Sequence, residues 1–273
     1  MVEKCSLIED VFFFQIDSLS GGRYVIYRWT LAIYCLVAMT LSITEHSQGK
    51  WIYLLTSLNY IIGTTYFLFA AVIVTWHFAN PRQSQPGGSA VQRREQRMST
   101  VALKEEEATA ITKPFKVTCQ VHWFLHNLAL NICTFVFVCF WVIIAPNRTR
   151  GYPPTLHTFL VFDRHGINLV LLIVDFLLIR IPTRILHCIY PSIFLGLYFL
   201  YNYIYWSKTG SLIYGKTLDY GTRGGFVAGL AIGGMLGLIP LMQLMWFSAY
   251  YMKQRNAKSK SDANDNIEDI RSI

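Results

Sequence analysis

Six long stretches of this chain are almost continuously apolar. They cover residues 24–43, 51–78, 121–145, 159–179, 186–205 and 226–252. About 20 apolar residues in a helix cross a bilayer core about 30 Å thick. Because lipid offers no hydrogen-bond partners and the runs lack the alternation of barrel strands, each run is predicted to be a helix. The pattern predicts an all-α fold, a polytopic transmembrane bundle of about six helices.

The six runs define a transmembrane domain over residues 24–252. One polar segment precedes it, one interrupts it and one follows it. Residues 1–23 mix aromatic and aliphatic side chains with acidic ones, which predicts a cytoplasmic segment lying in the membrane interface, with disorder as the alternative. Residues 79–120 form a long loop rich in glycine, proline and charge, which predicts a mobile cytoplasmic loop. The chain turns basic and then acidic over residues 253–273, which predicts a disordered cytoplasmic tail.

The composition confirms the membrane class and gives an orientation. Hydrophobic residues make up 53% of the chain and charged residues 15%, which is too apolar for an ordinary soluble domain. The net charge of +8 does not indicate nucleic acid, because most Lys and Arg residues fall in residues 1–23, 79–120, 180–184 and 253–273. The positive-inside rule therefore places both termini and the long loop in the cytoplasm, in either the plasma membrane or the endoplasmic reticulum.

Two further motifs concern the surface of the bundle. The sequon at Asn147 falls on the non-cytoplasmic side, although its closeness to the third span argues against glycosylation. Gly225, Gly229, Gly233 and Gly237 form a stripe with four-residue spacing, along which another helix can approach closely. Packing inside the protein is the favoured interpretation of the stripe, and a contact with a second protein is the alternative. Pro240 predicts a kink just beyond it.

Ionisable residues inside the spans are candidate functional groups, because burying them in lipid costs free energy. His122 and His126 are one helical turn apart, a spacing that can present two imidazoles to one metal ion. Topology places Asp175 and His187 in the same, cytoplasmic half of the bilayer. A metal-dependent membrane hydrolase is therefore one hypothesis. The alternative is that these four side chains only make interhelical hydrogen bonds, and no cofactor is expected.

Three segments carry a resemblance to a known family. Residues 165–175 read HGINLVLLIVD, residues 181–191 read IPTRILHCIYP, and residues 203–206 read YIYW. This combination resembles the rolling stone family. The resemblance implies a multi-pass membrane protein, and the member that gives the family its name is associated with myoblast fusion.

The rolling stone group is in turn distantly similar to the androgen-induced integral membrane hydrolases, which cleave fatty-acid esters of hydroxy fatty acids. By position, that similarity implies a nucleophile at Thr56 and the first histidine of the HGxH motif at His165. The catalytic histidine of those enzymes falls on Asn168, and an amide cannot accept the proton of a threonine hydroxyl.

The sequence therefore favours a non-enzymatic or degenerate member of the rolling stone family, acting in cell-surface events such as cell fusion. Membrane lipids and other membrane proteins are the expected partners, and nucleic acid is not. A lipid ester hydrolase that uses Thr56 with His165 as its base stays open as the enzymatic alternative.

Overall fold

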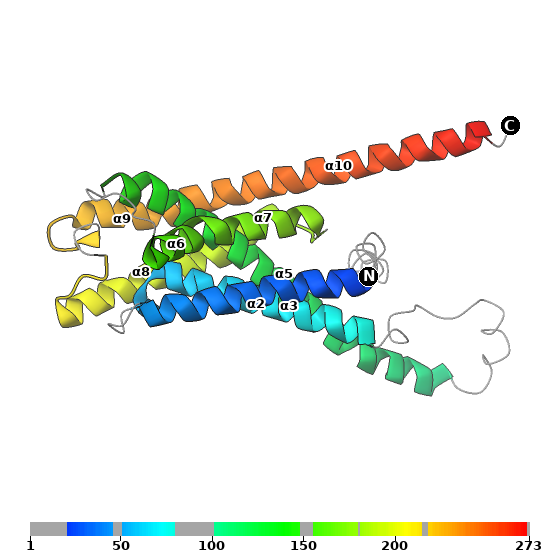
Figure 1. The fold of residues 1–273 in the computed structure, drawn as a ribbon, viewed down its shortest axis with the longest axis horizontal. Helices are drawn as coiled ribbons and strands as arrows, with labels where there is room; N and C mark the ends of the chain where they lie inside the picture. Colours follow the sequence, from blue (N-terminus) through cyan, green and yellow to red (C-terminus); the bar gives the residue numbers. More distant parts are fainter. Residues whose placement is uncertain are drawn as a thin grey trace. The chain divides into compact units, whose positions relative to one another are not determined.

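Most of the residues that the structure describes are helical. The computed structural model describes residues 21–45, 51–79, 101–147, 155–179, 181–214 and 218–271. The predicted all-α fold is confirmed. The α-helices are α2 (Gly21–Glu45), α3 (Leu55–Ala79), α5 (Val101–Cys139), α6 (Leu156–Phe162), α7 (Asn168–Leu178), α8 (Ile189–Thr209), α9 (Gly224–Gly233) and α10 (Ile239–Arg271) (Figure 1).

Among the described residues, five helices are long and apolar enough to cross a membrane. They are Gly22–Glu45, Leu55–Ala79, Val117–Ile144, Ile185–Thr209 and Gly224–Asn256. The stretch predicted as the fourth span is also helical, through α6, the π-helix η5 (Asp163–Ile167) and α7. This stretch contains three charged residues, Asp163, Arg164 and Asp175, which make it less apolar than an ordinary membrane span.

Short π-helical segments interrupt three of the long helices. They are η3 (Phe140–Ile144), η5 and η8 (Gly234–Leu238). The segment η8 lies immediately before Pro240, where the missing proline N–H was predicted to disturb the helix. The Ser192 hydroxyl donates a 2.8 Å hydrogen bond to the carbonyl oxygen of Met235 in this segment, so a neighbouring helix supplies a donor there.

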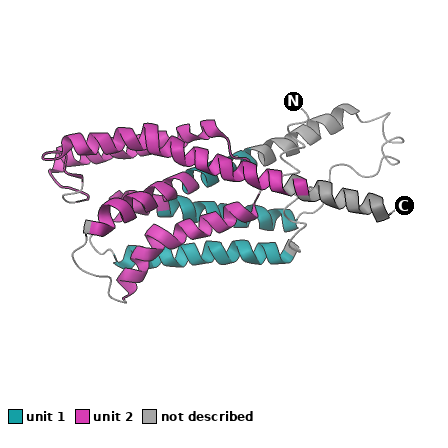
Figure 2. Ribbon diagram, turned by 90° about the horizontal axis from the view of Figure 1, so that it is seen from above, with its two compact units in different colours: residues 1–47, 60–129 teal, residues 48–59, 130–273 magenta. Residues whose placement is uncertain are grey.

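The chain divides into two compact units, shown in teal and magenta in Figure 2. Unit 1 contains residues 1–47 and 60–129, and unit 2 contains residues 48–59 and 130–273. In unit 1, the buried ring of Tyr66 lies 5.2 Å from the His122 ring and 5.3 Å from the His126 ring. Trp29 Nε1 donates to Thr75 Oγ1 at 2.8 Å, which ties α2 to α3.

In unit 2, Gln243 links three elements. Its Oε1 accepts a 2.7 Å hydrogen bond from Asn131 Nδ2 of α5, and its Nε2 donates a 2.6 Å bond to the carbonyl oxygen of Arg184. Further along α10, Lys253 Nζ donates to the carbonyl oxygens of Phe176 and Ile179, at 3.0 and 2.6 Å. Because helix C-termini leave carbonyl groups without intrahelical donors, Lys253 stabilises the end of α7.

We expect Gln243→Leu to lower the stability of the protein. The side chain is fully buried and makes two interhelical bonds, each worth about 0.6 and at most about 1.7 kcal/mol in a membrane, so the loss is about 1–3 kcal/mol. Thermal unfolding in detergent measures it. Gln254→Leu, at an exposed position of the same helix, is the control. Equal melting temperatures for the two variants would contradict the prediction.

The glycine stripe has no close neighbour among the described residues. No described atom lies within 4 Å of a Cβ built at any of its four positions, and packing of the stripe inside the protein stays a prediction. The close approach occurs instead at Gly234, where a Cβ would lie 3.0 Å from Phe135 Cε2 and 3.1 Å from Leu195 Cδ2. A four-residue repeat identifies a smooth helix face, but it does not show which face meets a neighbour. Contact of the stripe Gly225, Gly229, Gly233 and Gly237 with a second protein stays a prediction.

Two predicted polar segments differ from the structure where it describes them. The helix α10 continues to Arg271, whereas residues 253–273 were predicted to be disordered. The helix α5 begins at Val101, inside the segment predicted as a mobile loop. Residues 1–20 and 80–100, and the sequon residues that follow Asn147, lie outside the described part of the chain.

Candidate functional site

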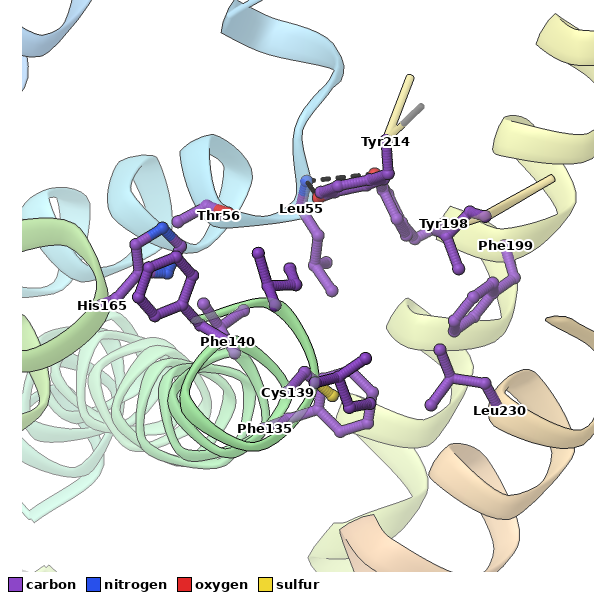
Figure 3. Close-up of a pocket in the computed structure, with 14 residues that line it drawn as sticks. Leu55, Thr56, Phe135, Cys139, Phe140, His165, Tyr198, Phe199, Tyr214 and Leu230 are labelled. Carbon is purple, nitrogen blue, oxygen red and sulfur yellow. Dashed lines mark hydrogen bonds between the residues drawn. The ribbon is translucent and has the colours of Figure 1, made fainter. Parts of the chain in front are cut away.

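A cavity of about 60 Å³ lies inside unit 2. A water molecule needs about 10–15 Å³ on the same scale, so the cavity admits a small chemical group and not a whole lipid. The chemistry-bearing side chains around it are Thr56, His165, Tyr198, Tyr214 and Cys139 (Figure 3). The rest of the lining is apolar and consists of Leu55, Phe135, Val136, Phe140, Ile143, Ile144, Phe199, Leu218 and Leu230.

Two tyrosine hydroxyls bind the first turn of α3. The backbone N–H of Leu55 donates to the hydroxyls of Tyr214, at 2.7 Å, and Tyr198, at 3.1 Å. The Tyr198 hydroxyl donates to the carbonyl oxygen of Tyr53 at 3.0 Å and accepts from Asn202 Nδ2 at 3.2 Å. The first N–H groups of a helix have no intrahelical acceptor, so these phenols replace the usual capping side chain and fix the start of α3.

The same phenol group is the neighbour of Thr56. The Tyr214 hydroxyl interacts with both the hydroxyl and the backbone N–H of Thr56. Burial raises the pKa of Tyr214 above its usual value, although its hydrogen bonds with Tyr198, Leu55 and Thr56 act in the opposite direction. Tyr214 is therefore protonated at neutral pH, and its oxygen already accepts from the Leu55 N–H, so it is not a base that accepts the Thr56 proton.

His165 lies on the same side of the cavity as Thr56, against the wall made by α5 (Figure 3). Its ring stacks on Phe140, with the ring centres 3.6 Å apart and the planes 9° from parallel. Trp141 Nε1 donates a 3.1 Å hydrogen bond to the carbonyl oxygen of His165. Phe140 and Trp141 belong to the π-helical segment η3, and His165 belongs to η5. Such segments are frequent at functional sites.

Comparison with known families decides the classification. The family model described as "Protein rolling stone" matches residues 11–261, nearly the whole chain and all of the cavity lining. The chain belongs to the rolling stone family. The relationship suggested by the three sequence segments is therefore confirmed.

A curated rolling stone relative gives the degree of similarity. Protein rolling stone of Drosophila melanogaster is 26% identical over 201 residues, which cover 72% of this chain and 64% of that protein. The chain thus matches somewhat less than two thirds of the length of this relative. No solved structure matches this rolling stone family chain.

The structure brings together two of the three residues that similarity to the hydrolases suggested. Thr56 and His165 line one cavity. Asn168 begins α7 one turn beyond His165; it is 1% exposed and is not part of the lining. The phenols of Tyr198 and Tyr214 were not predicted, because they lie in α8 and in the connection after it, where no local motif marks them. Only the folded chain shows that they reach the first turn of α3.

The four residues of the metal hypothesis belong to different units, His122 and His126 to unit 1 and Asp175 and His187 to unit 2. Within the described part of this rolling stone family member, no group of three His, Cys, Asp or Glu side chains is arranged to hold a metal ion. His122 and His126 instead contact the ring of Tyr66, and His187 lies 6.3 Å from the ring of Tyr190. Asp175 is fully buried in α7. The spacing of two histidines showed a shared helix face, and that face packs against an aromatic ring.

Proposed function

We propose that this chain is a multi-pass membrane protein that binds the polar group of an amphiphilic lipid in the unit 2 cavity without hydrolysing the lipid. One observation carries the proposal. The hydroxyl of Thr56 lies beside a phenol that is protonated at neutral pH, and the position of the catalytic histidine in the similar hydrolases is Asn168. The cavity therefore offers hydrogen-bond donors, and the residue at the position of that catalytic histidine is an amide, which cannot activate a threonine.

The lining supports an uncharged ligand group. No Lys or Arg side chain is among the described residues around the cavity, so nothing there neutralises a phosphate. Nine of the fourteen lining residues are Leu, Ile, Val or Phe, which suits a group attached to a hydrocarbon chain. A hydroxyl, ester or amide with its acyl chain in the surrounding bilayer fits both features.

The cellular role in this proposal is one at the cell surface, such as cell fusion. This role rests on membership of the rolling stone family and on the association with cell fusion that the resemblance implied. In the proposed orientation, both termini and the loop before α5 lie in the cytoplasm. Protease protection of tags placed at the two ends tests the orientation. Cell-cell content mixing, measured after depletion of the protein, tests the role, and unchanged mixing would contradict it.

Photo-crosslinking with a lipid tests binding in the cavity. We expect a monoacylglycerol that carries a photoreactive group near its ester to label unit 2, and Cys139→Leu to reduce labelling about tenfold by filling the cavity. Cys188→Leu is the matched control, because Cys188 is also in unit 2 but does not line the cavity. Equal labelling of both variants would contradict binding at this place.

A threonine-type lipid ester hydrolase is the second candidate, and the shared cavity of Thr56 and His165 is the observation that favours it. A fluorophosphonate probe separates the two functions. Under our proposal the native protein is not labelled, and Thr56→Ala and His165→Ala change nothing. Labelling that disappears in Thr56→Ala, but persists in Thr134→Ala, would establish the hydrolase instead.

A further inference from the structure

Beside the cavity, unit 2 buries polar side chains that have no ordinary partner. Ser57, Asn59 and Asn168 are 0–1% exposed. Among the described residues, no group makes a hydrogen bond of normal geometry with Ser57 Oγ or with either amide atom of Asn59 or Asn168. Buried amides are normally bonded through both atoms, so this concentration of unpaired groups is what a binding site for a polar group requires.

The two asparagines belong to one cluster. The amide of Asn59 approaches the Cys133 thiol, a weak hydrogen-bonding partner, and the Asp163 carboxyl acts electrostatically on the same thiol. The backbone N–H of Asn168 bonds to the carbonyl oxygen of Asp163, so these two residues are one π-helical turn apart. We call Asn59, Asp163 and Asn168 the buried amide cluster.

The cluster adjoins the cavity along two helical segments. Asn59 is one turn after Thr56 in α3, and Asn168 is one turn after His165 at the start of α7. Both Thr56 and His165 line the cavity. Because residues three positions apart share a helix face, Asn59 and Asn168 are neighbours of these two lining residues.

We propose that the buried amide cluster is the head-group site for an uncharged lipid whose polar end both donates and accepts hydrogen bonds, such as a glycerol or an amide. This inference rests on the proposed function and names its ligand class. The Asn168 amide has a donor atom and an acceptor atom that are both without a partner among the described residues. A bare cation satisfies only the acceptor and a phosphate only the donor.

Three photoreactive probes with the same hydrocarbon chain test the inference in the full-length protein in lipid nanodiscs. Their head groups are a glycerol ester, a free carboxylate and a phosphocholine. We expect the glycerol probe to label unit 2 at least tenfold more than the other two. Asn168→Leu and Asn59→Leu should each reduce that labelling about tenfold. Asn127→Leu, at a buried asparagine of unit 1, should not reduce it.

The outcomes distinguish this inference from the proposed function. Equal labelling by the three probes, unchanged in Asn168→Leu, overturns the head-group site and leaves lipid binding in the cavity standing. Absence of unit 2 labelling with all three probes overturns both. If Asn168→Leu does not fold, Asn168→Ser, which keeps a small polar group, replaces it. Selective loss of glycerol-probe labelling in Asn168→Ser supports the site, and unchanged labelling overturns it.

Discussion

Asn168→His is expected to make Thr56 reactive. The resemblance to the membrane hydrolases implies a catalytic histidine at the position of Asn168, and a positioned base contributes about 10²–10⁴-fold to such a reaction. The native cavity holds Thr56 beside a protonated phenol, so adding the base supplies the missing part of a nucleophile pair. We expect fluorophosphonate labelling to rise from background by at least a hundredfold, measured by fluorescence in gels of purified protein.

The control is the double variant Asn168→His with Thr56→Ala, in which labelling should return to background. Asn168→Gln controls for the larger side chain at this buried position without adding a base. Labelling of native protein as strong as that of Asn168→His would show that His165 already activates Thr56. Absence of labelling in folded Asn168→His would show that more than the base is missing.

The fold was largely predictable from the sequence, because membrane spans leave a strong composition signal. The apolar runs gave the helices, and the matching helices α2, α3 and α8 are close to the predicted ranges. The π-helical segments were not predictable, since one extra residue in a turn depends on which neighbours the helix contacts. Side-chain spacing also does not show which helix face meets a neighbouring helix, and the close approach at Gly234, beside the stripe, was for that reason not predicted.

The candidate site was predictable only where a family resemblance reached it. Thr56 and His165 came from aligned positions, and the structure places both in one cavity. Tyr214 lies 158 positions after Thr56 in the chain, and no spacing rule connects residues so far apart. Its role follows from hydrogen bonds to Leu55 and Thr56, which exist only in the folded protein.

We expect Gly234→Leu to destabilise the protein by about 1–3 kcal/mol, the usual range for an overpacked core. A Cβ at this position would lie 3.0 Å from Phe135 Cε2 and 3.1 Å from Leu195 Cδ2. Both neighbours are almost completely buried, so a larger side chain at Gly234 must displace them. Phe135 also lines the cavity, so a shift of its ring should weaken crosslinking of the lipid probe as well. Unfolding in mixed micelles with increasing denaturing detergent measures the loss.

Gly233→Leu is the matched control for this prediction. Gly233 is the preceding residue, at the end of α9, and a Cβ there meets no described atom within 4 Å. Leucine favours a helix over glycine equally at both positions, by up to about 1 kcal/mol, so the difference between the variants isolates the steric contact. Gly233→Leu should therefore be neutral or slightly stabilising. Equal stability of the two variants would mean that α5 and α8 do not approach the chain closely at Gly234, and the cavity wall formed by Phe135 would then be open to rearrangement.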